Sequence, residues 1–345
     1  MSDPSQIPSQ MRAVDIKNGQ GGLDALFINS HTPVPRPTNS QALIRIKAFG
    51  LNRMDLLQRE GQYPVPAGAS PILGVEFSGT IVQLPPSPPA SAHDWRLGDE
   101  VFGLAYGGAY AEYIAVSTQM LIRKPAELSW EQCAGIPETW ITATQALFLI
   151  GEFRSGKSVL WHAGASSVSI AGIQLAREEG AAAVYVTASS SEKIEFCKSL
   201  GATQGFNYRD SNWAEELLKA TDGKGVDLIV DFVGASYFNQ NLDAVARDGR
   251  IVNLGFLGGN TVKEPVDIGR FLRKRCRFEG SSLRSRDEDY QGKLRDQLVE
   301  HALPRLRDGR FQVPIEKVFK MTQIRDAHEL MESNKTKGKL ICLVD

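Results

Sequence analysis

The first third of the chain carries short segments in which apolar and polar residues alternate, the pattern of strands with one buried face. The clearest of these segments cover residues 43–48, 75–82 and 109–116. Gly and Pro residues separate them, and the Pro-rich stretch 84–92 is expected to be an irregular surface loop. The pattern predicts a β-rich domain over residues 1–132.

From about residue 133, continuous apolar runs alternate with segments that have the spacing of amphipathic helices. The predicted strands cover residues 158–164, 183–188, 205–208, 226–233 and 250–255, and the predicted helices cover 169–179, 192–200, 213–220 and 237–246. This alternation predicts a doubly wound parallel sheet with right-handed crossovers over residues 133–279. Residues 280–345 are too few for a third domain. We expect their helices, at 293–306 and 324–331, and their strand, at 338–344, to complete the first domain.

The first strand of the second domain leads into a turn of small residues and then into a helix. At this place a Rossmann fold holds a pyrophosphate, because small residues let the backbone approach and the helix N-terminus presents free N–H groups. The candidate phosphate-binding residues are Gly164, Ser166, Ser167 and Val168. The usual fingerprint has three glycines and this turn has only Gly164, so an ordinary serine-capped turn is the alternative.

The ends of the following strands indicate which dinucleotide would bind. The second strand ends without the Asp or Glu that binds a ribose hydroxyl in NAD enzymes. Ser189 and Lys193 follow it instead, and a lysine suits the additional phosphate of NADP. A solvated helix residue is the alternative for Lys193. Tyr208, at the end of the third strand, is a further candidate for that phosphate. The end of the fifth strand is expected to pass close to the nicotinamide with Gly255, Phe256 and Leu257.

Composition excludes several classes of function. Of the 345 residues, 39 are Lys or Arg and 40 are Asp or Glu, so bulk charge attracts neither nucleic acid nor an anionic membrane. The basic cluster at residues 270–277 is expected to be a solvated or interface surface. No apolar run approaches the ~20 residues of a membrane span, and residues 1–10 lack the pattern of a signal peptide. Four dispersed cysteines predict buried thiols in a reducing, cytoplasmic setting.

Five spaced motifs resemble those of the medium-chain dehydrogenase/reductase superfamily: residues 51–55 with 61–63, then 74–79, 98–101 and 136–140. More narrowly, they are similar to its zinc-free quinone oxidoreductases, the group that contains zeta-crystallin. Residues 206–208 and 283–287 resemble the damage-inducible quinone oxidoreductase branch. The resemblance extends from about residue 11 to residue 344.

The resemblance implies a GroES-like β-rich catalytic domain with a Rossmann domain inserted before its last segment. It also implies a homodimer, usually formed between Rossmann domains, and NADPH as the cofactor. By position in the motifs, Asn52 and Tyr63 would reach the cofactor from the catalytic domain, Ser166 from the phosphate turn, and Arg284 from the returning loop.

Zinc is not expected, because the metal-ligating residues of the alcohol dehydrogenase relatives are replaced. Residues 51–53 contain no cysteine, the Gly-His-Glu motif is Gly74-Val75-Glu76, and no cluster of four cysteines exists. Another departure is that Ser167 and Ser169 stand where the family has Gly. Each adds a side chain at the pyrophosphate turn, so the open question is whether they weaken cofactor binding.

Without a metal, an aligned hydride donor and a hydrogen-bond donor at the substrate oxygen must carry the reaction. The prediction is an NADPH-dependent reduction of quinones, with ortho-quinones favoured. Tyr63 would polarise the carbonyl oxygen, Ser166 would assist and Asn52 would orient. An aromatic lid without proton transfer is the alternative for Tyr63. The alternative functions are an enone or alkenal double-bond reductase and a non-catalytic NADPH-binding protein.

Overall fold

The computed structural model describes residues 7–38, 40–85 and 95–344. The chain folds into two compact units: unit 1 comprises Met1–Ile141 and Arg284–Asp345, and unit 2 comprises Thr142–Leu283. The Pro-rich stretch 84–92 lies, from residue 86 onward, outside the described residues. Unit 1 is therefore built from two segments of the chain, and unit 2 from the single segment between them.

Unit 1 is built on a seven-stranded sheet with the strand order β14-β15-β3-β4-β5-β7, in which β6 also pairs with β3. The strands are β3 (Gln41–Gly50), β4 (Glu76–Gln83), β5 (Glu100–Leu104), β6 (Tyr113–Ser117), β7 (Leu121–Arg123), β14 (Ile315–Lys320) and β15 (Lys339–Leu343). A separate antiparallel pair joins β1 (Gln10–Ile16) to β2 (Leu26–Pro33). The alternating segments 43–48 and 75–82 thus lie in β3 and β4, apart from Val75.

The predicted strand 109–116 is only half formed, since β6 begins at Tyr113. The N–H groups of Ala109 and Tyr110 donate instead to the carbonyls of Gly74 and Leu73, so this part of the chain pairs with a loop. Gly107 and Gly108, both with positive φ, turn the backbone just before it.

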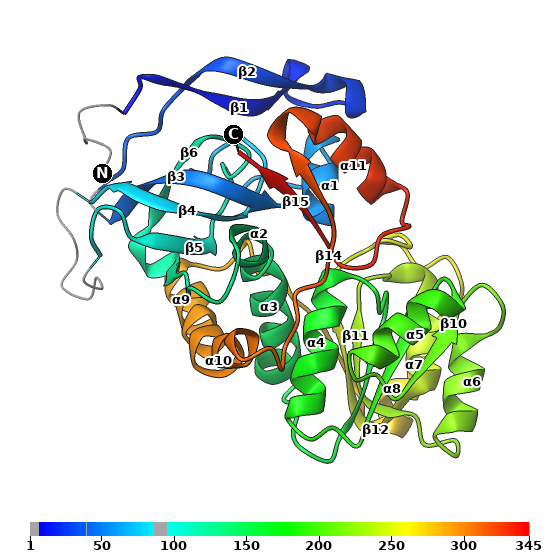
Figure 1. Ribbon diagram of the computed structural model, residues 1–345. Helices are drawn as coiled ribbons and strands as arrows, with labels where there is room; N and C mark the ends of the chain where they lie inside the picture. Colours follow the sequence, from blue (N-terminus) through cyan, green and yellow to red (C-terminus); the bar gives the residue numbers. More distant parts are fainter. Residues whose placement is uncertain (1–6, 39, 86–94, 345) are drawn as a thin grey trace. The chain divides into compact units, whose positions relative to one another are not determined.

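The last strand of the chain completes the sheet of unit 1. β15 pairs antiparallel with β3, with Ile341 opposite Gly50 and Cys342 opposite Phe49 (Figure 1). All these residues except Gly50 are fully buried apolar side chains, so this junction is part of the core. The helices of unit 1 are α1 (Arg53–Arg59), α2 (Trp130–Ala134), α9 (Glu288–Gln297), a π-helix (Leu298–Ala302), α10 (Leu303–Arg307) and α11 (Ile324–Glu332). α3 (Pro137–Thr144) crosses the boundary between the units, at Ile141.

Unit 2 is a six-stranded parallel sheet with the order β10-β9-β8-β11-β12-β13. Its strands are β8 (Ser158–Trp161), β9 (Ala183–Ala188), β10 (Gln204–Asn207), β11 (Val226–Asp231), β12 (Val245–Asn253) and β13 (Arg277–Gly280). Its helices are a π-helix (Gln145–Ile150), α4 (Ser167–Glu178), α5 (Ser191–Ser199), α6 (Trp213–Ala220), α7 (Phe238–Ala244) and α8 (Gly269–Lys274). The strand order reverses beside β8, which places a topological switch point between β8 and β11.

Right-handed crossovers put α4 and α5 on one face of this sheet and α6 and α7 on the other. A buried cluster confirms the second pairing, because Trp213 and Leu217 of α6 and Leu242 of α7 pack with Leu160 and Ile229 of the sheet. The predicted fold class is confirmed: a β-rich GroES-like domain and a doubly wound Rossmann domain.

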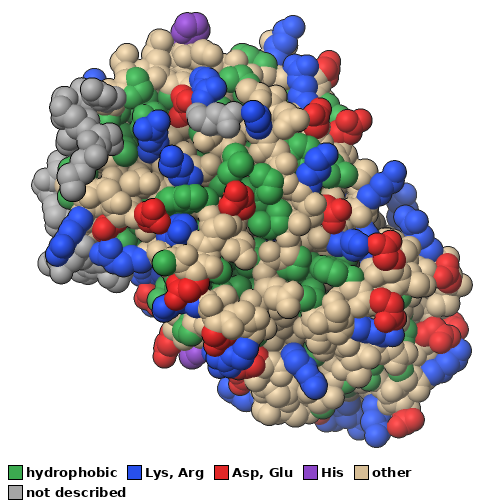
Figure 2. All heavy atoms as spheres, viewed as in Figure 1, with side chains coloured by type: hydrophobic (Ala, Val, Ile, Leu, Met, Phe, Trp, Pro, Cys, Tyr) green, Lys and Arg blue, Asp and Glu red, His purple; other side chains and the backbone are tan. Residues whose placement is uncertain are grey.

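The surface charges and the cysteines do not indicate a particular function. Lys and Arg side chains are interspersed with Asp and Glu over the face seen in Figure 2. None of the helices in the described ranges has the length and apolar character that a membrane span needs. The four cysteines are free and buried. The cytoplasmic location stays a prediction.

Candidate functional site

The turn after β8 is organised by two serine hydroxyls. Ser166 is the N-cap of α4, and its Oγ accepts a hydrogen bond from the N–H of Ser169 at 3.4 Å. Its hydroxyl donates to Ser169 Oγ at 3.0 Å, and the Ser169 hydroxyl donates to the carbonyl of His162 at 2.8 Å. Ser169 is fully buried, so its hydroxyl ties the helix to the end of the strand.

The same turn keeps the open N-terminus that anion binding requires. Ser167 and Val168 lie half-buried in the first turn of α4, where N–H groups have no intrahelical partner. Gly164 is needed because a Cβ there would lie 2.7 Å from Cβ of Val186. All four predicted phosphate-binding residues thus stand at the carboxyl end of β8, and their role stays a prediction.

A buried polar network lies beneath this turn. His162 contacts Thr187 Oγ1 through Nδ1 at 2.9 Å and Asn241 Oδ1 through Nε2 at 2.8 Å. The Asn241 amide donates to Asp231, and so does the amide of Asn253, at 3.1 and 3.2 Å. Burial lowers the pKa of His162, so the ring is neutral, with its proton on Nε2 facing the amide oxygen.

This network spans the carboxyl ends of four strands. His162 directly follows β8, and Thr187, Asp231 and Asn253 lie at the ends of β9, β11 and β12, while Asn241 joins them from within α7. Asp231 also accepts the N–H groups of Val233 and Gly234, at 2.7 and 3.1 Å. Hydrogen bonds among buried groups fix the loops in one arrangement. Sequence patterns did not identify Thr187, Asn241, Asp231 or Asn253. For Thr187, Asp231 and Asn253 the only signal was their polarity at the ends of apolar runs, and Asn241, in a polar stretch of α7, gave none.

The remaining predicted cofactor residues of unit 2 lie at this same edge. Ser189 and Lys193 flank the start of α5, where Ser190 is the N-cap and accepts the N–H of Lys193. Tyr208 follows β10, donates its N–H to the carbonyl of Ala188, and is 42% exposed. The loop after β12 presents Gly255 and the exposed side chains of Phe256 and Leu257.

In unit 1, Tyr63 and Arg284 lie together. The guanidinium carbon of Arg284 is 5.6 Å from the centre of the Tyr63 ring, a cation–π arrangement. Arg284 is 3% exposed and donates to the carbonyl of Tyr106 and to Oε1 of Gln58. Tyr63 itself is half-buried in the segment that follows α1. The cofactor contact predicted for Arg284 stays a prediction. Within unit 1, its hydrogen bonds join the start of the returning segment to Gln58 and Tyr106.

Asn52 belongs to a charged cluster of the same unit. As the N-cap of α1, it donates from Nδ2 to Oε1 of Glu76 at 2.9 Å, and its Oδ1 accepts from Lys339 at 3.0 Å. Lys339 also donates to Glu76 and to the carbonyl of Leu51. Sequence analysis missed Lys339. Its one signal was a lysine at the start of an otherwise apolar strand.

Two further carboxyl groups near this cluster have raised pKa values. Burial raises the pKa of Asp55 to about 6, against the opposing effects of the hydrogen bonds from Asn52 and Tyr110 and of the charge on Lys339. Burial and the nearby charge of Glu76 raise the pKa of Glu138 to about 7. Oδ1 of Asp55 has no hydrogen-bond partner among the described residues.

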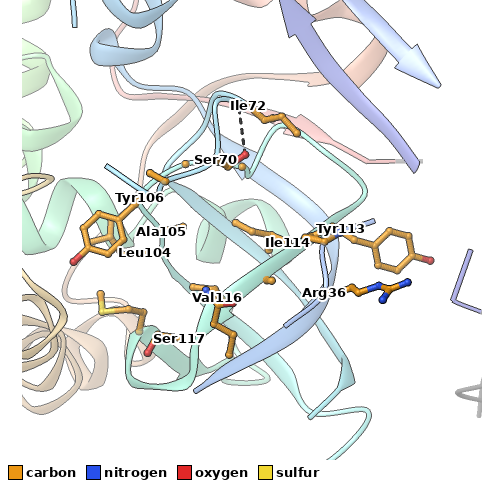
Figure 3. A pocket seen from close by; sticks show the side chains of 18 of the residues that line it. Arg36, Ser70, Ile72, Leu104, Ala105, Tyr106, Tyr113, Ile114, Val116 and Ser117 are labelled. Atoms are coloured by element: carbon orange, nitrogen blue, oxygen red, sulfur yellow. Dashed lines mark hydrogen bonds between the residues drawn. The ribbon is translucent and has the colours of Figure 1, made fainter. Parts of the chain in front are cut away.

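Unit 1 also has a surface pocket of about 360 Å³. In Figure 3 the side chains of Tyr106, Ile114, Tyr113 and Arg36 are arranged around it, and Ser70 accepts the N–H of Ile72 at 3.2 Å. None of the predicted site residues lines this pocket. It is therefore distinct from the cluster around Asn52 and Lys339.

Two family models match the chain. The model described as zinc-binding dehydrogenase matches residues 167–300, and the alcohol dehydrogenase GroES-like domain matches residues 38–126. The first description implies a zinc ion, and the residues present do not fit one. At the motif positions, Asn52 and Glu76 already surround the ammonium of Lys339. Within the described ranges, no three His, Cys, Asp or Glu side chains are grouped as metal ligands.

Relatives and solved structures cover nearly the whole chain. A phenolphthiocerol/phthiocerol polyketide synthase from Mycobacterium tuberculosis is 28% identical over 93% of this chain, which spans only 14% of that much longer protein. The Pseudomonas syringae quinone oxidoreductase is 26% identical, with TM-score 0.83 over 96% of this chain and 99% of that one.

Two more structures are similar over their full lengths. Mycobacterial Rv1454c, solved with NADPH, is 27% identical, with TM-score 0.85 over 96% of this chain and 100% of that one. The CurK enoyl reductase is 27% identical, with TM-score 0.81 over 97% and 100%. With a GroES-like domain, a doubly wound parallel sheet and family-model matches to both, the chain belongs to the medium-chain dehydrogenase/reductase superfamily.

Proposed function

We propose that this protein is an NADPH-dependent quinone oxidoreductase that works without a metal ion and favours ortho-quinones. The observation that carries the proposal is the end of β9, where no Asp or Glu stands directly at the strand end and Ser189 and Ser190 follow it. Lys193 lies in the first turn of α5, beside Glu192, the first acidic residue after the strand. A carboxylate would repel the additional phosphate of NADPH, whereas hydroxyls and an ammonium bind it. The similarity to a quinone oxidoreductase and to an NADPH complex supports the same assignment.

The cofactor, when bound, supplies a hydride. The protein supplies the rest: the start of α4 holds the pyrophosphate between Ser166 and Val168, and Tyr63 donates a proton to the quinone oxygen. One hydride and one proton convert a quinone to a hydroquinone, so the proton from Tyr63 completes the reduction and Tyr63 recovers a proton from solvent. Arg284 beside the Tyr63 ring stabilises negative charge that develops there.

The test is anaerobic oxidation of NADPH at 340 nm with an ortho-quinone, beside an α,β-unsaturated ketone and with NADH as the cofactor control. Faster turnover of the quinone with NADPH than with NADH supports the proposal. Preference for the ketone moves the protein to the double-bond reductases, the alternative that its similarity to an enoyl reductase favours. Tight binding of NADPH with no turnover of either compound makes it a binding protein.

Replacing Tyr63 by Phe separates proton donation from packing. We expect kcat for the quinone to fall about 100-fold, in the range of general acid catalysis, with an unchanged Kd for NADPH. Unchanged turnover would leave Tyr63 as an aromatic cover only.

We also propose that two copies associate through the edge of the sheet in unit 2. Among the described strands, β13 pairs only with β12, so its outer edge has free backbone donors and acceptors. Ile268 and Leu272, beside it in sequence, are 77% and 82% exposed, and Phe278 of β13 is 39% exposed. Apolar residues beside an open edge favour an isologous interface. Light scattering checks this: the wild type should be a dimer and Leu272→Glu a monomer.

A further inference from the structure

Lys339 is a charged side chain in the interior of unit 1, where burying a charge costs desolvation free energy. It is 2% exposed, and Glu76 is fully buried beside it. Its ammonium has three donors, and three acceptors surround it: the carbonyl of Leu51 at 2.9 Å, Oδ1 of Asn52 at 3.0 Å, and Oε1 of Glu76. Each hydrogen of the ammonium therefore has a partner, which is the condition under which a buried ion pair is tolerated.

The cluster joins four elements that are far apart in sequence. Lys339 begins β15, Glu76 begins β4, and Asn52 caps α1. The other oxygen of Glu76 accepts the N–H of Glu138 in α3, at 2.9 Å. Gly50 makes room for it, because a Cβ at Gly50 would lie 2.4 Å from Oε1 of Glu76. The sheet is thus shaped around this carboxylate.

The Asn52 carboxamide is held at both ends. Its oxygen accepts from the ammonium and its nitrogen donates to the carboxylate, while its backbone N–H donates to Asp55 at 2.8 Å. These contacts fix the first turn of α1, a helix of only seven residues, and Tyr63 follows α1 four residues after its last residue. A short helix has little stability of its own, so its position depends on such contacts.

We propose that Lys339 is a positioning residue of the reaction, a built-in ammonium that sets the segment from Asn52 to Tyr63 through Asn52 and Glu76. This inference rests on the proposed function for its effect on turnover. Its effect on the segment itself is independent of that function.

The experiment compares Lys339→Met with the double variant Lys339→Met/Glu76→Gln. The single variant leaves Glu76 as a buried unpaired charge and is expected to lose stability. The double variant removes both charges and keeps the side-chain volumes. It is therefore expected to fold, and it shows the effect of losing the ammonium without leaving an unpaired buried charge. Lys335→Met, at an exposed lysine of the same segment, is the matched control.

The first readout is hydrogen exchange of peptides covering residues 52–63. For the double variant we expect exchange about ten-fold faster than in the wild type, with peptides of α4 in unit 2 unchanged. The second readout is quinone reduction: kcat should fall about ten-fold or more, while the Kd for NADPH stays the same. Lys335→Met should match the wild type in both.

The inference is overturned if the double variant has wild-type exchange at residues 52–63, because the neutral pair then positions the segment as well as the ions do. The same criterion applies to the double variant even if the wild-type protein reduces no quinone. In that case the proposed function has failed, and the exchange data still decide whether Lys339 positions the segment. Methylammonium added to Lys339→Ala should slow the exchange again, whereas tetramethylammonium, which has no N–H, should not.

Discussion

Ser169 tests whether the hydroxyl-rich phosphate turn is a defect or a substitute for glycine. Replacing Ser169 by Gly restores the residue that the family resemblance implies, and it removes two hydrogen bonds of a fully buried hydroxyl. Each bond contributes about 1 kcal/mol, and glycine in the first turn of a helix costs about 0.5 kcal/mol more than serine. We therefore expect the free energy of unfolding of unit 2 to fall by about 2.5 kcal/mol, which lowers its unfolding midpoint by roughly 8 °C.

The assay is thermal unfolding followed by tryptophan fluorescence, since Trp161 and Trp213 are buried in unit 2. Ser167→Gly is the control: it makes the same exchange two residues earlier, at a half-buried position, and should lower the midpoint by less than half as much. The NADPH affinity of Ser169→Gly should stay within about two-fold of the wild type, because the hydroxyl points to the His162 carbonyl. A variant as stable as the wild type, or one that binds NADPH ten-fold more tightly, refutes the reasoning.

The remaining predictions concern specificity and pH. Lys193→Ala should weaken NADPH binding about ten-fold and leave NADH binding unchanged, as measured by fluorescence titration. An equal loss of affinity for both cofactors would contradict a contact between Lys193 and the additional phosphate of NADPH. Asp55 has a folded pKa of about 6, above its ordinary 3.8, so the folded state binds that proton more tightly and stability falls as pH rises from 4 to 6. Because Asp55 is fully buried, the loss is about 3 kcal/mol. Asp55→Asn should flatten the pH dependence of the urea unfolding midpoint between pH 4 and pH 6. An unchanged slope would contradict the assignment. His328, whose pKa burial lowers to about 3, acts oppositely: its contribution to stability is lost as pH falls below 6.5, and His328→Gln should remove that loss.

Unit 2 was the more predictable half, because its strands are buried on both faces and form continuous apolar runs. The strand 183–188 and the helix 213–220 have the bounds that the pattern predicted. β12 begins at Val245, five residues before the predicted start. Residues 245–249 include Arg247, Asp248 and Gly249, and polar residues at a sheet end carry no apolar signal. The resemblance supplied the family, and the family models agree with it at the level of the superfamily.

Unit 1 was harder, because its helices are short or interrupted. The predicted helix 293–306 is in fact α9, a π-helix at Leu298–Ala302, and α10, with Pro304 at the start of α10. Proline has no N–H to donate and displaces the carbonyl four residues earlier, so the hydrogen-bond ladder widens before it. The spacing of apolar residues continues with a period of about 3.6 across such a break, so the sequence pattern cannot reveal the π-helix.

The candidate site divides along the same physical line. Residues whose role follows from a place on one strand end, such as Gly164 and Ser166, can be found in the sequence, because a parallel sheet brings all its carboxyl ends to one edge. Lys339 and Glu76 cannot, since 263 positions separate them and each alone is an ordinary surface residue type. What brings them together is the strand order β15-β3-β4, because Lys339 begins β15 and Glu76 begins β4, the two strands that flank β3. Both charges are buried there. A buried ion pair is rarely the most stable choice, because apolar side chains of equal volume avoid the cost of desolvation. Its presence beside Asn52, with a hydrogen bond for every donor, is therefore better explained by the fixed geometry it gives to α1 than by stability.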